Sequence, residues 1–141
     1  MPPIVDPLKD LPGYALRRAS AAVMAKLAER LTALALRPSE ASVLLVIDAN
    51  PGVTQSEIGR LLDIARANMA PLTARLVARD LIVRESTGGR SHGLTLSESG
   101  RRLAKKAQRM VAGLETELME RIPAAQRAAF LRTLKALFTG W

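Results

Sequence analysis

The side chains best suited to specific recognition lie in the middle of the chain, between residues 54 and 92. An arginine can donate two parallel hydrogen bonds to the edge of a guanine, and an asparagine can pair similarly with an adenine. Hydroxyl groups and the amides at a helix N-terminus can bind phosphate oxygens. The residues from which we predict contacts to double-stranded DNA are Thr54, Gln55, Ser56, Arg66, Asn68, Thr73, Arg75, Arg79, Arg90 and His92.

Several other kinds of chemistry are excluded because cysteine is absent and His92 is the only histidine. A disulfide framework, a thiol nucleophile and a Cys/His zinc site all need residues that the chain lacks. The sequence also lacks paired carboxylates at motif spacing, a nucleophile beside a base, and a phosphate-binding loop. We therefore predict that the protein is not an enzyme and has no catalytic residues, no cofactor and no metal site.

Two short helices are expected to position the recognition residues. Residues 54–57 have the spacing of a capping box, in which the Thr54 hydroxyl accepts the Glu57 amide and the glutamate bonds back to Thr54. A break at 63–65 precedes a second helix over about 66–79. Two such helices joined by a short turn form a helix-turn-helix. The residues expected on the outward side of the second helix are Arg66, Ala67, Asn68, Ala70, Pro71, Thr73 and Ala74.

The remaining elements flank this motif. Two strands are favoured at the ends of a segment whose glycine-rich centre would be the tip of a hairpin. Helical spacing of apolar residues predicts a long helix on either side of the motif, and Pro38 suits the first position of a helix between them. The predicted strands cover 81–85 and 94–96, and the predicted helices cover 8–36, 41–48, 98–120 and 124–138. The predicted fold is therefore mainly α with a small β-hairpin wing, in the order ααααββαα.

Positive charge is concentrated in the same central segment. The chain has 141 residues, which fits a single domain (1–141), and it carries a formal net charge of +8. Residues 60–110 contain eleven Lys or Arg against four Asp or Glu, so they hold nearly all of that charge. Such clustering favours a polyanionic partner, and an aromatic content of 3% argues against single-strand binding by base stacking. Since the sequence shows neither a signal peptide nor an apolar run of about 18 residues, we expect a cytoplasmic protein without a membrane partner.

The central motifs, taken in order, resemble those of one family of bacterial regulators. The matching residues are Pro51-Gly52-Val53-Thr54-Gln55-Ser56-Glu57-Ile58-Gly59-Arg60-Leu61-Leu62, Arg66, Leu72, Arg75-Leu76, Arg79-Asp80-Leu81-Ile82, Arg90 and Leu94-Thr95-Leu96-Ser97-Glu98-Ser99-Gly100. Through these residues, and over nearly its whole length, the chain resembles the MarR family of winged helix-turn-helix regulators. The resemblance implies a homodimer in a bacterial cytoplasm, associated with the nucleoid when it binds a palindromic operator. It also implies that 38–96 form the DNA-binding lobe and that 8–36 and 98–138 are mainly dimerisation helices.

Three positions depart from the family pattern. Gly89 stands where an aspartate usually precedes the wing arginine, so a salt bridge that stiffens the wing is expected to be missing. Pro71 lies inside the second helix of the motif, where it offers no N–H to the Ala67 carbonyl and is expected to bend or loosen the first turns. Ala74 replaces the usual acidic residue before Arg75, which leaves that arginine free to turn toward phosphate.

The resemblance further implies an interface between terminal helices and a site for a small effector. The residues expected in the dimer interface are Leu8, Leu11, Phe130, Leu134, Leu137, Phe138 and Trp141. Family members commonly release DNA when an aromatic carboxylate or a phenol enters a cleft between the dimer helices and the DNA-binding lobe. An arginine can pair with a carboxylate, and a tyrosine can bond a phenol. The candidate effector-binding residues are Tyr14, Arg17, Arg18, Met24, Ser39, Ser42 and Met110.

Some of these residues also have simpler interpretations. Capping is the main role expected of Thr54, and His92 is more often an exposed loop residue. Arg75 and Arg79 could pair with Asp80 or Glu85 instead of phosphates. The basic residues over 101–109 form like-charged i,i+4 pairs, so they either favour DNA in general or form a solvated face.

The leading interpretation is a dimeric repressor that a small ligand releases from its operator. An architectural DNA-binding protein with little sequence preference is the main alternative, because residues 65–74 offer few hydrogen-bonding side chains. A protein of the membrane surface would explain the charge but not the helix-turn-helix and the wing. Footprinting separates the first two interpretations, since a repressor protects one palindromic site and an architectural protein protects DNA diffusely.

Overall fold

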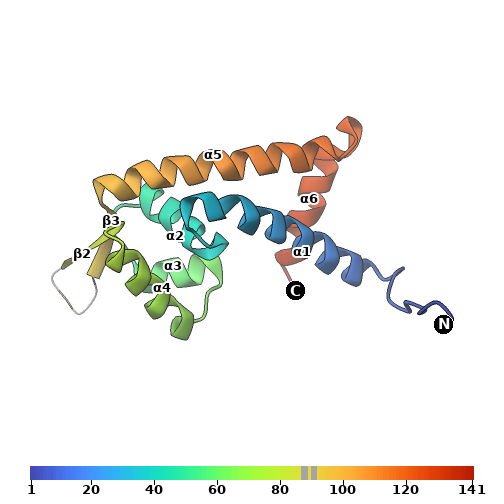
Figure 1. Ribbon diagram of the computed structural model, residues 1–141, viewed down its shortest axis with the longest axis horizontal. Helices are drawn as coiled ribbons and strands as arrows, with labels where there is room; N and C mark the ends of the chain where they lie inside the picture. The colour runs from blue at the N-terminus through green and yellow to red at the C-terminus, as the bar shows by residue number, and fades with distance from the viewer. Residues whose placement is uncertain (87–88, 90–91) are drawn as a thin grey trace.

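The chain folds into helices and a small sheet in the computed structural model, which describes residues 1–86, 89 and 92–141. The elements in chain order are α1 (Pro12–Leu31), η1 (Thr32–Leu34), α2 (Pro38–Ala49), β1 (Val53–Thr54), α3 (Gln55–Leu62), α4 (Arg66–Ala78), β2 (Ile82–Ser86), β3 (His92–Leu96), α5 (Glu98–Glu120), η2 (Ala124–Gln126) and α6 (Arg127–Phe138). Figure 1 shows α5 along the top, α2 beneath it, and α3 and α4 below α2. The predicted order ααααββαα is confirmed, with one additional short strand and two 3-10 turns.

One continuous apolar core holds α2, α3, α4 and the sheet against the first half of α5. The consecutive apolar residues of α2 are mostly buried as their density predicts, with Leu44 and Ile47 fully inaccessible to solvent and Leu45 and Val46 partly exposed. Ile58 from α3 and Leu76 from α4 are equally buried against them. Since burying one such side chain contributes about 1.5–3 kcal/mol, this core fixes the two helices of the motif relative to α2 and the sheet.

The sheet has three antiparallel strands in the order β1-β3-β2. The predicted hairpin of β2 and β3 is present, with Ile82 opposite Leu96 at the base of its register. Its second strand begins at His92, two residues earlier than predicted, so His92 lies in a strand and not in the loop. The strand β1 was not predicted, because two residues are too few to show an alternating pattern. Its pairing of Val53 with Leu94 attaches the start of α3 to the hairpin, so helix-turn-helix and wing form one rigid lobe.

The first helix is shorter than the predicted span of 8–36. It begins at Pro12, whose fixed φ and missing N–H suit the first turn of a helix, and a separate turn precedes it. It ends at Leu31 and passes into the 3-10 turn η1, after which Ala35 adopts a left-handed conformation with φ of 51°. The last predicted helix, 124–138, likewise begins with the 3-10 turn η2 and becomes α-helical only from Arg127.

The two terminal helices extend away from the lobe and expose apolar side chains. Every residue of α6 is at least partly exposed, and Phe138 retains 74% of its accessible surface. On α1 and the turn before it, Leu11, Leu16 and Met24 are also exposed. Exposed apolar surface of this extent marks a site of protein contact. Among the helices described, none is both long enough and apolar enough to span a bilayer.

A close backbone contact seats the start of α5 on the lobe. The Ser97 hydroxyl lies 2.5 Å from the Asp80 carbonyl and accepts the Gly100 amide at 3.0 Å, which caps the helix. A Cβ atom added at Gly100 would lie only 1.9 Å from the Leu81 carbonyl oxygen. The first turn of α5 can therefore approach the segment between α4 and β2 only because position 100 has no side chain.

We predict that Gly100→Ala lowers the free energy of unfolding by about 2–3 kcal/mol, because the helix must move away from the Leu81 backbone. Gly113→Ala in the same helix is the matched control, since a Cβ there meets no described atom within 4 Å. It should raise stability by up to about 1 kcal/mol through helix propensity. Urea denaturation of the two variants measures both values, and equal stabilities would contradict the close contact.

Candidate nucleic-acid interface

The N-terminus of α3 is built by the predicted capping box. The backbone N–H of Thr54 donates to Glu57 Oε2 at 2.8 Å, and the Glu57 amide donates to Thr54 Oγ1 at 3.3 Å. The Thr54 amide, followed by its hydroxyl, lowers the pKa of the Glu57 carboxyl. The box confirms capping as the role of Thr54 and holds Gln55 and Ser56 in the first turn, where helix amides favour an anion.

A hollow of about 400 Å³ gathers five of the predicted recognition residues from four elements. Its lining consists of Thr54, Gln55, Ser56, Arg66, Arg84, His92 and Leu94. The N-termini of α3 and α4 form one side of this hollow and the hairpin strands form the other. Since Arg66 and Arg84 are exposed cations beside helix amides, the hollow is suited to a phosphate group.

The residue that sequence reasoning missed here is Arg84. Arg84 lies within the predicted first strand of the hairpin and is one of the cations of the central segment. In the observed register Arg84 pairs with Leu94 and Ser86 with His92, so these residues share one face of the sheet. Two-residue alternation along that strand was the signal that could have placed Arg84 beside His92.

The first turn of α4 presents Arg66 and Asn68 to solvent, as predicted. The helix continues through Pro71 as a single element from Arg66 to Ala78. Both Pro71 and Ala67 are exposed, so water can satisfy the Ala67 carbonyl that proline leaves without an amide. The departure at Pro71 thus affects one hydrogen bond on the solvent side and leaves the helix intact.

The prediction that Thr73 faces outward is wrong. Its accessible surface is 0%, because it lies on the same side of α4 as Met69, Leu72 and Leu76. Within the described part of the chain, its buried hydroxyl has no hydrogen-bond partner. Thr73 is therefore a core residue and does not contact DNA in this conformation.

Arg75 and Arg79 bond to other groups of the protein, so they are not free to bind phosphate as predicted. Among the described residues, neither forms the alternative ion pair with Asp80 or Glu85. Arg75 Nε lies 3.6 Å from Oε2 of the buried Glu40 at the start of α2. Arg79 donates to the Ala35 carbonyl at 2.6 Å and to the Leu34 carbonyl at 3.2 Å. Both arginines instead attach the second half of α4 to the junction between α1 and α2.

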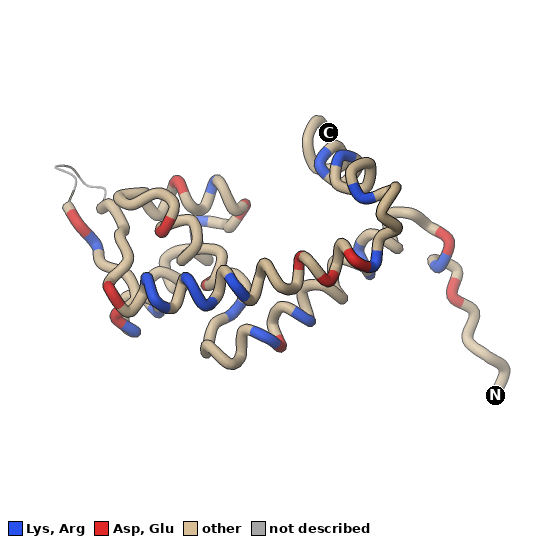
Figure 2. Tube along the Cα trace, turned by 90° about the horizontal axis from the view of Figure 1, so that it is seen from above, with Lys and Arg blue, Asp and Glu red and all other residues tan. Residues whose placement is uncertain are grey.

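The positive charge of the central segment is divided between two sides of the molecule. The cations of the helix-turn-helix lie on one side, whereas Figure 2 shows a second run of basic residues along the first half of α5. Figure 1 places α2 between α5 and the pair α3 and α4. The cations of α5 therefore lie on a different side of the molecule from those of the helix-turn-helix. Arg90, predicted at the wing tip, lies outside the described residues.

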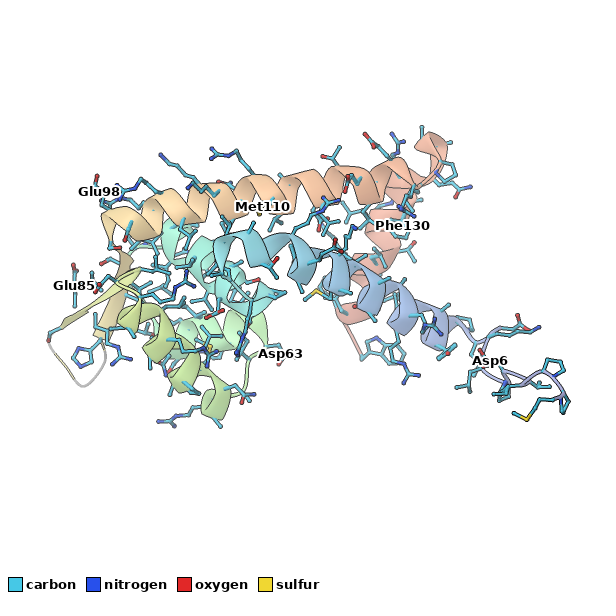
Figure 3. The ribbon with its side chains drawn as sticks, in the orientation of Figure 1. Asp6, Asp63, Glu85, Glu98, Met110 and Phe130 are labelled. Carbon is cyan, nitrogen blue, oxygen red and sulfur yellow. The ribbon has the colours of Figure 1, made fainter. Side chains whose placement is uncertain are left out.

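The candidate effector residues occupy separate places in one protomer. Tyr14 lies at the start of α1 and accepts a hydrogen bond from Arg18 Nη1 at 2.9 Å, and Arg17 lies 5.3 Å from the centre of its ring. Met24 is exposed further along α1, and Met110 packs against the core between α5 and α1 (Figure 3). The two serines, Ser39 and Ser42, lie in the first turns of α2, beyond the other end of α1.

The predicted interface residues lie on the exposed terminal segments. Leu8 and Leu11 precede or border α1, and α6 with the residues after it carries the others. The residues that are fully or partly exposed are Leu8, Leu11, Phe130, Leu134, Leu137, Phe138 and Trp141. In Figure 3, Phe130 lies on the part of α6 that descends from the end of α5 toward α1.

Comparison with known proteins identifies the family. A model of the MarR family matches residues 36–91. The solved structure of the transcriptional repressor CouR bound to a 23-mer DNA duplex is 36% identical to this chain, with a TM-score of 0.87, and the match covers 97% of this chain and 99% of CouR. The chain belongs to the MarR family. The predicted winged helix-turn-helix regulator is therefore confirmed, and MarR proteins are dimers.

CouR and one further relative of this MarR protein have been solved with small molecules. CouR bound to p-coumaroyl-CoA is 34% identical, with a TM-score of 0.88 and coverage of 98% of this chain and 99% of that chain. The HTH-type transcriptional repressor Rv2887 of Mycobacterium tuberculosis is 28% identical over 127 residues, which are 89% of this chain and 91% of the relative. Rv2887 has been solved in complex with p-aminosalicylic acid, with a TM-score of 0.72 to this MarR protein over 89% of this chain and 97% of that chain.

We predict that Arg66→Ala weakens binding to a selected operator duplex by about 1–3 kcal/mol and relaxes the sequence preference at one base pair. The variant Arg121→Ala removes the same charge at the end of α5, far from the hollow, and should leave both properties unchanged. Fluorescence anisotropy measures the affinities, and repeated selection from a randomised duplex measures the preference. A loss of affinity that is equal in the two variants would contradict the placement of Arg66.

Thr73→Val should raise the free energy of unfolding by about 1 kcal/mol, because it removes a buried hydroxyl without a partner. The same substitution should leave DNA affinity unchanged. Asn68→Ala, on the exposed side of the same helix, should instead weaken DNA binding. Thermal denaturation and fluorescence anisotropy of the two variants measure stability and DNA affinity. If Thr73→Val bound DNA poorly, the conclusion that Thr73 does not contact DNA would be contradicted.

Proposed function

We propose that the protein is a homodimeric transcriptional repressor that binds a palindromic operator and releases it when a small aromatic effector binds. The observation that carries the proposal is the hollow in which the N-termini of α3 and α4 converge with the hairpin. Its cations and helix amides are directed to one exposed surface. The similarity to CouR, which has been solved bound to a DNA duplex, supports the same use here.

We assign phosphate and base contacts separately within this surface. Gln55 and Ser56, at the start of α3, would bind phosphate, together with Arg84 on the hairpin. Arg66 and Asn68, at the exposed start of α4, would read bases in the major groove. Arg90 and His92, on the wing, would contact the adjacent groove of the DNA.

The terminal helices support the proposed homodimer. Leu11 and Met24 on one side and Phe138 and Trp141 on the other expose apolar surface that a monomer would leave in water. A second copy of the chain would cover this surface and place two recognition helices on one face of a duplex. Residues 38–96 would then act as the DNA-binding lobe and the terminal segments as the dimer frame, in a bacterial cytoplasm and on the nucleoid.

The proposed effector is an aromatic acid or its thioester. CouR has been solved with p-coumaroyl-CoA and Rv2887 with p-aminosalicylic acid, both of which contain an aromatic ring and an anionic group. In this chain, Tyr14 and the guanidinium groups of Arg17 and Arg18 bring together an aromatic ring and two cations. These groups suit an aromatic anion, and we propose that Met24, Met110 and the two α2 serines, Ser39 and Ser42, complete the site in the dimer.

An architectural DNA-binding protein remains the second candidate, and one observation favours it. With Thr73 in the core, Arg66 and Asn68 are the side chains in the first half of α4 that can form directional bonds with bases. Alanines and Pro71 fill much of the remaining exposed surface there. Such a surface can contact thymine methyl groups but supplies few hydrogen bonds for discrimination.

Selection from a randomised duplex library tests the proposed function against this alternative. The purified dimer should enrich one palindromic sequence, and footprinting on the enriched duplex should show a single protected site. Enrichment without a consensus, together with diffuse protection, would instead support the architectural protein. Light scattering of the free protein tests the dimer in the same preparation.

Addition of p-coumaroyl-CoA, salicylate and free coenzyme A to the enriched complex tests release. An aromatic acid or thioester should raise the melting temperature of the free protein and displace the duplex, because it binds the DNA-free form more tightly. Free coenzyme A controls for the nucleotide moiety alone. Release by none of the aromatic compounds would contradict control by this class of effector without affecting the operator assignment.

A further inference from the structure

The first half of α5 carries a continuous row of cations that the proposed interface does not use. We call it the α5 ridge, and its members are Arg101, Arg102, Lys105, Lys106 and Arg109. Because an α-helix turns by about 100° per residue, these positions fall within an arc of about 140°. The centre of that arc is opposite the side on which Ala104 and Ala107 are fully buried. All members of the ridge are exposed to solvent.

The ridge lowers the intrinsic stability of its own helix. Arg101 with Lys105, Arg102 with Lys106, and Lys105 with Arg109 are like-charged pairs at i,i+4, and each such pair destabilises a helix by about 0.2–0.5 kcal/mol. Cations near the N-terminus of a helix also destabilise it, because they are repelled by the positive end of the helix macrodipole. An unspecialised solvated face would mix the two signs of charge, so this arrangement indicates a partner that offsets the repulsion.

Most acidic residues of α5 lie away from the ridge, whereas Asp48 and Glu85 of other elements line a hollow with Arg101, which donates to the Leu96 carbonyl at 3.2 Å. Glu115, Glu117 and Glu120 are confined to the last turns, where the macrodipole disfavours them. Figure 2 shows this division along α5, with blue segments followed by red ones. Among the described residues, Arg102 is the ridge member with an ion pair, at 3.0 Å from Glu98.

The ridge faces away from the proposed operator-binding surface. The buried side of α5 packs on α1, α2 and β3, and Figure 1 shows α2 between α5 and α4. A straight duplex that lies along the exposed start of α4 therefore cannot also reach the ridge. Any polyanion bound by the ridge is a different segment of polymer from the one that α4 reads.

We propose that the α5 ridge binds the phosphate backbone of a second DNA duplex, so that an operator-bound dimer bridges two segments of DNA. The ridge spans nine residues, or about 12 Å of helix from Arg101 to Arg109, and duplex DNA offers one phosphate charge per about 1.7 Å of its axis. Five exposed cations along one face of a helix suit contact with that backbone, which carries no sequence information. This inference rests on the proposed function, because the first duplex is the operator held by α3 and α4.

A capture assay tests the bridge. The operator duplex enriched by selection, trimmed to about the 23 bp bound by CouR, is fixed to beads and saturated with protein. A fluorescent duplex of unrelated sequence is then added at low salt. The wild-type protein should capture it, and capture should fall steeply with salt because counterions are released. Lys105→Gln with Lys106→Gln should reduce capture at least about tenfold and reduce the salt slope by about two.

The matched control is Lys9→Gln with Arg121→Gln, which removes the same charge from exposed positions outside the ridge and should retain capture. Protein retained on the beads reports operator binding separately, so failure of the proposed function is distinguishable from failure of the bridge. Absence of capture by the wild type, or equal capture by both double variants, would overturn the proposal. The proposal would also be overturned if the ridge variant lost operator binding as strongly as it lost capture. Binding to anionic vesicles that depends on the ridge, with no capture of a second duplex, would overturn it as well.

Discussion

The recognition helix depends on one buried carboxylate, that of Glu40. It is 4% exposed, accepts the Arg37 amide at 2.8 Å to cap α2, and faces Arg75 of α4 at 3.6 Å. A carboxylate at this depth is stable only when hydrogen bonds and a cation compensate its lost hydration. Arg79 adds a second attachment through the Leu34 and Ala35 carbonyls at the end of η1. The second half of α4 is thereby fixed to the junction between the first two helices.

This attachment explains how one helix can be held firmly and still present a free surface. Its first turn, with Arg66 and Asn68, is exposed, whereas its second half supplies the arginines that bind the rest of the molecule. Recognition and anchoring are thus separated along a single helix of 13 residues. The junction that receives the anchors also joins α1, which carries exposed apolar surface, so α4 and the proposed dimer frame share a direct structural contact.

The features predicted correctly from sequence are those set by neighbouring residues. The capping box at Thr54, the turn after α3 and the apolar run of α2 all depend on contacts within a few positions. The wrong predictions concern contacts between distant segments. The partner of Arg75 lies 35 residues earlier in the chain and those of Arg79 lie 44 and 45 residues earlier, which spacing cannot reveal. Thr73 was assigned by its polarity, although its helical position lies among the apolar residues of the inner face.

The glycine at the start of α5 has a consequence for the dimensions of the whole assembly. Because Gly100 allows α5 to lie directly on the Leu81 backbone, this contact helps to set the distance from the lobe to this long, continuous helix. In a two-fold symmetric dimer built from the terminal helices, that distance helps to determine how far apart the two copies of α4 stand. The separation of recognition helices in turn selects the half-site spacing, which must match about one helical turn of DNA, or 34–36 Å, or a multiple of it. The absence of a side chain at Gly100 therefore contributes to the number of base pairs between the two operator half-sites.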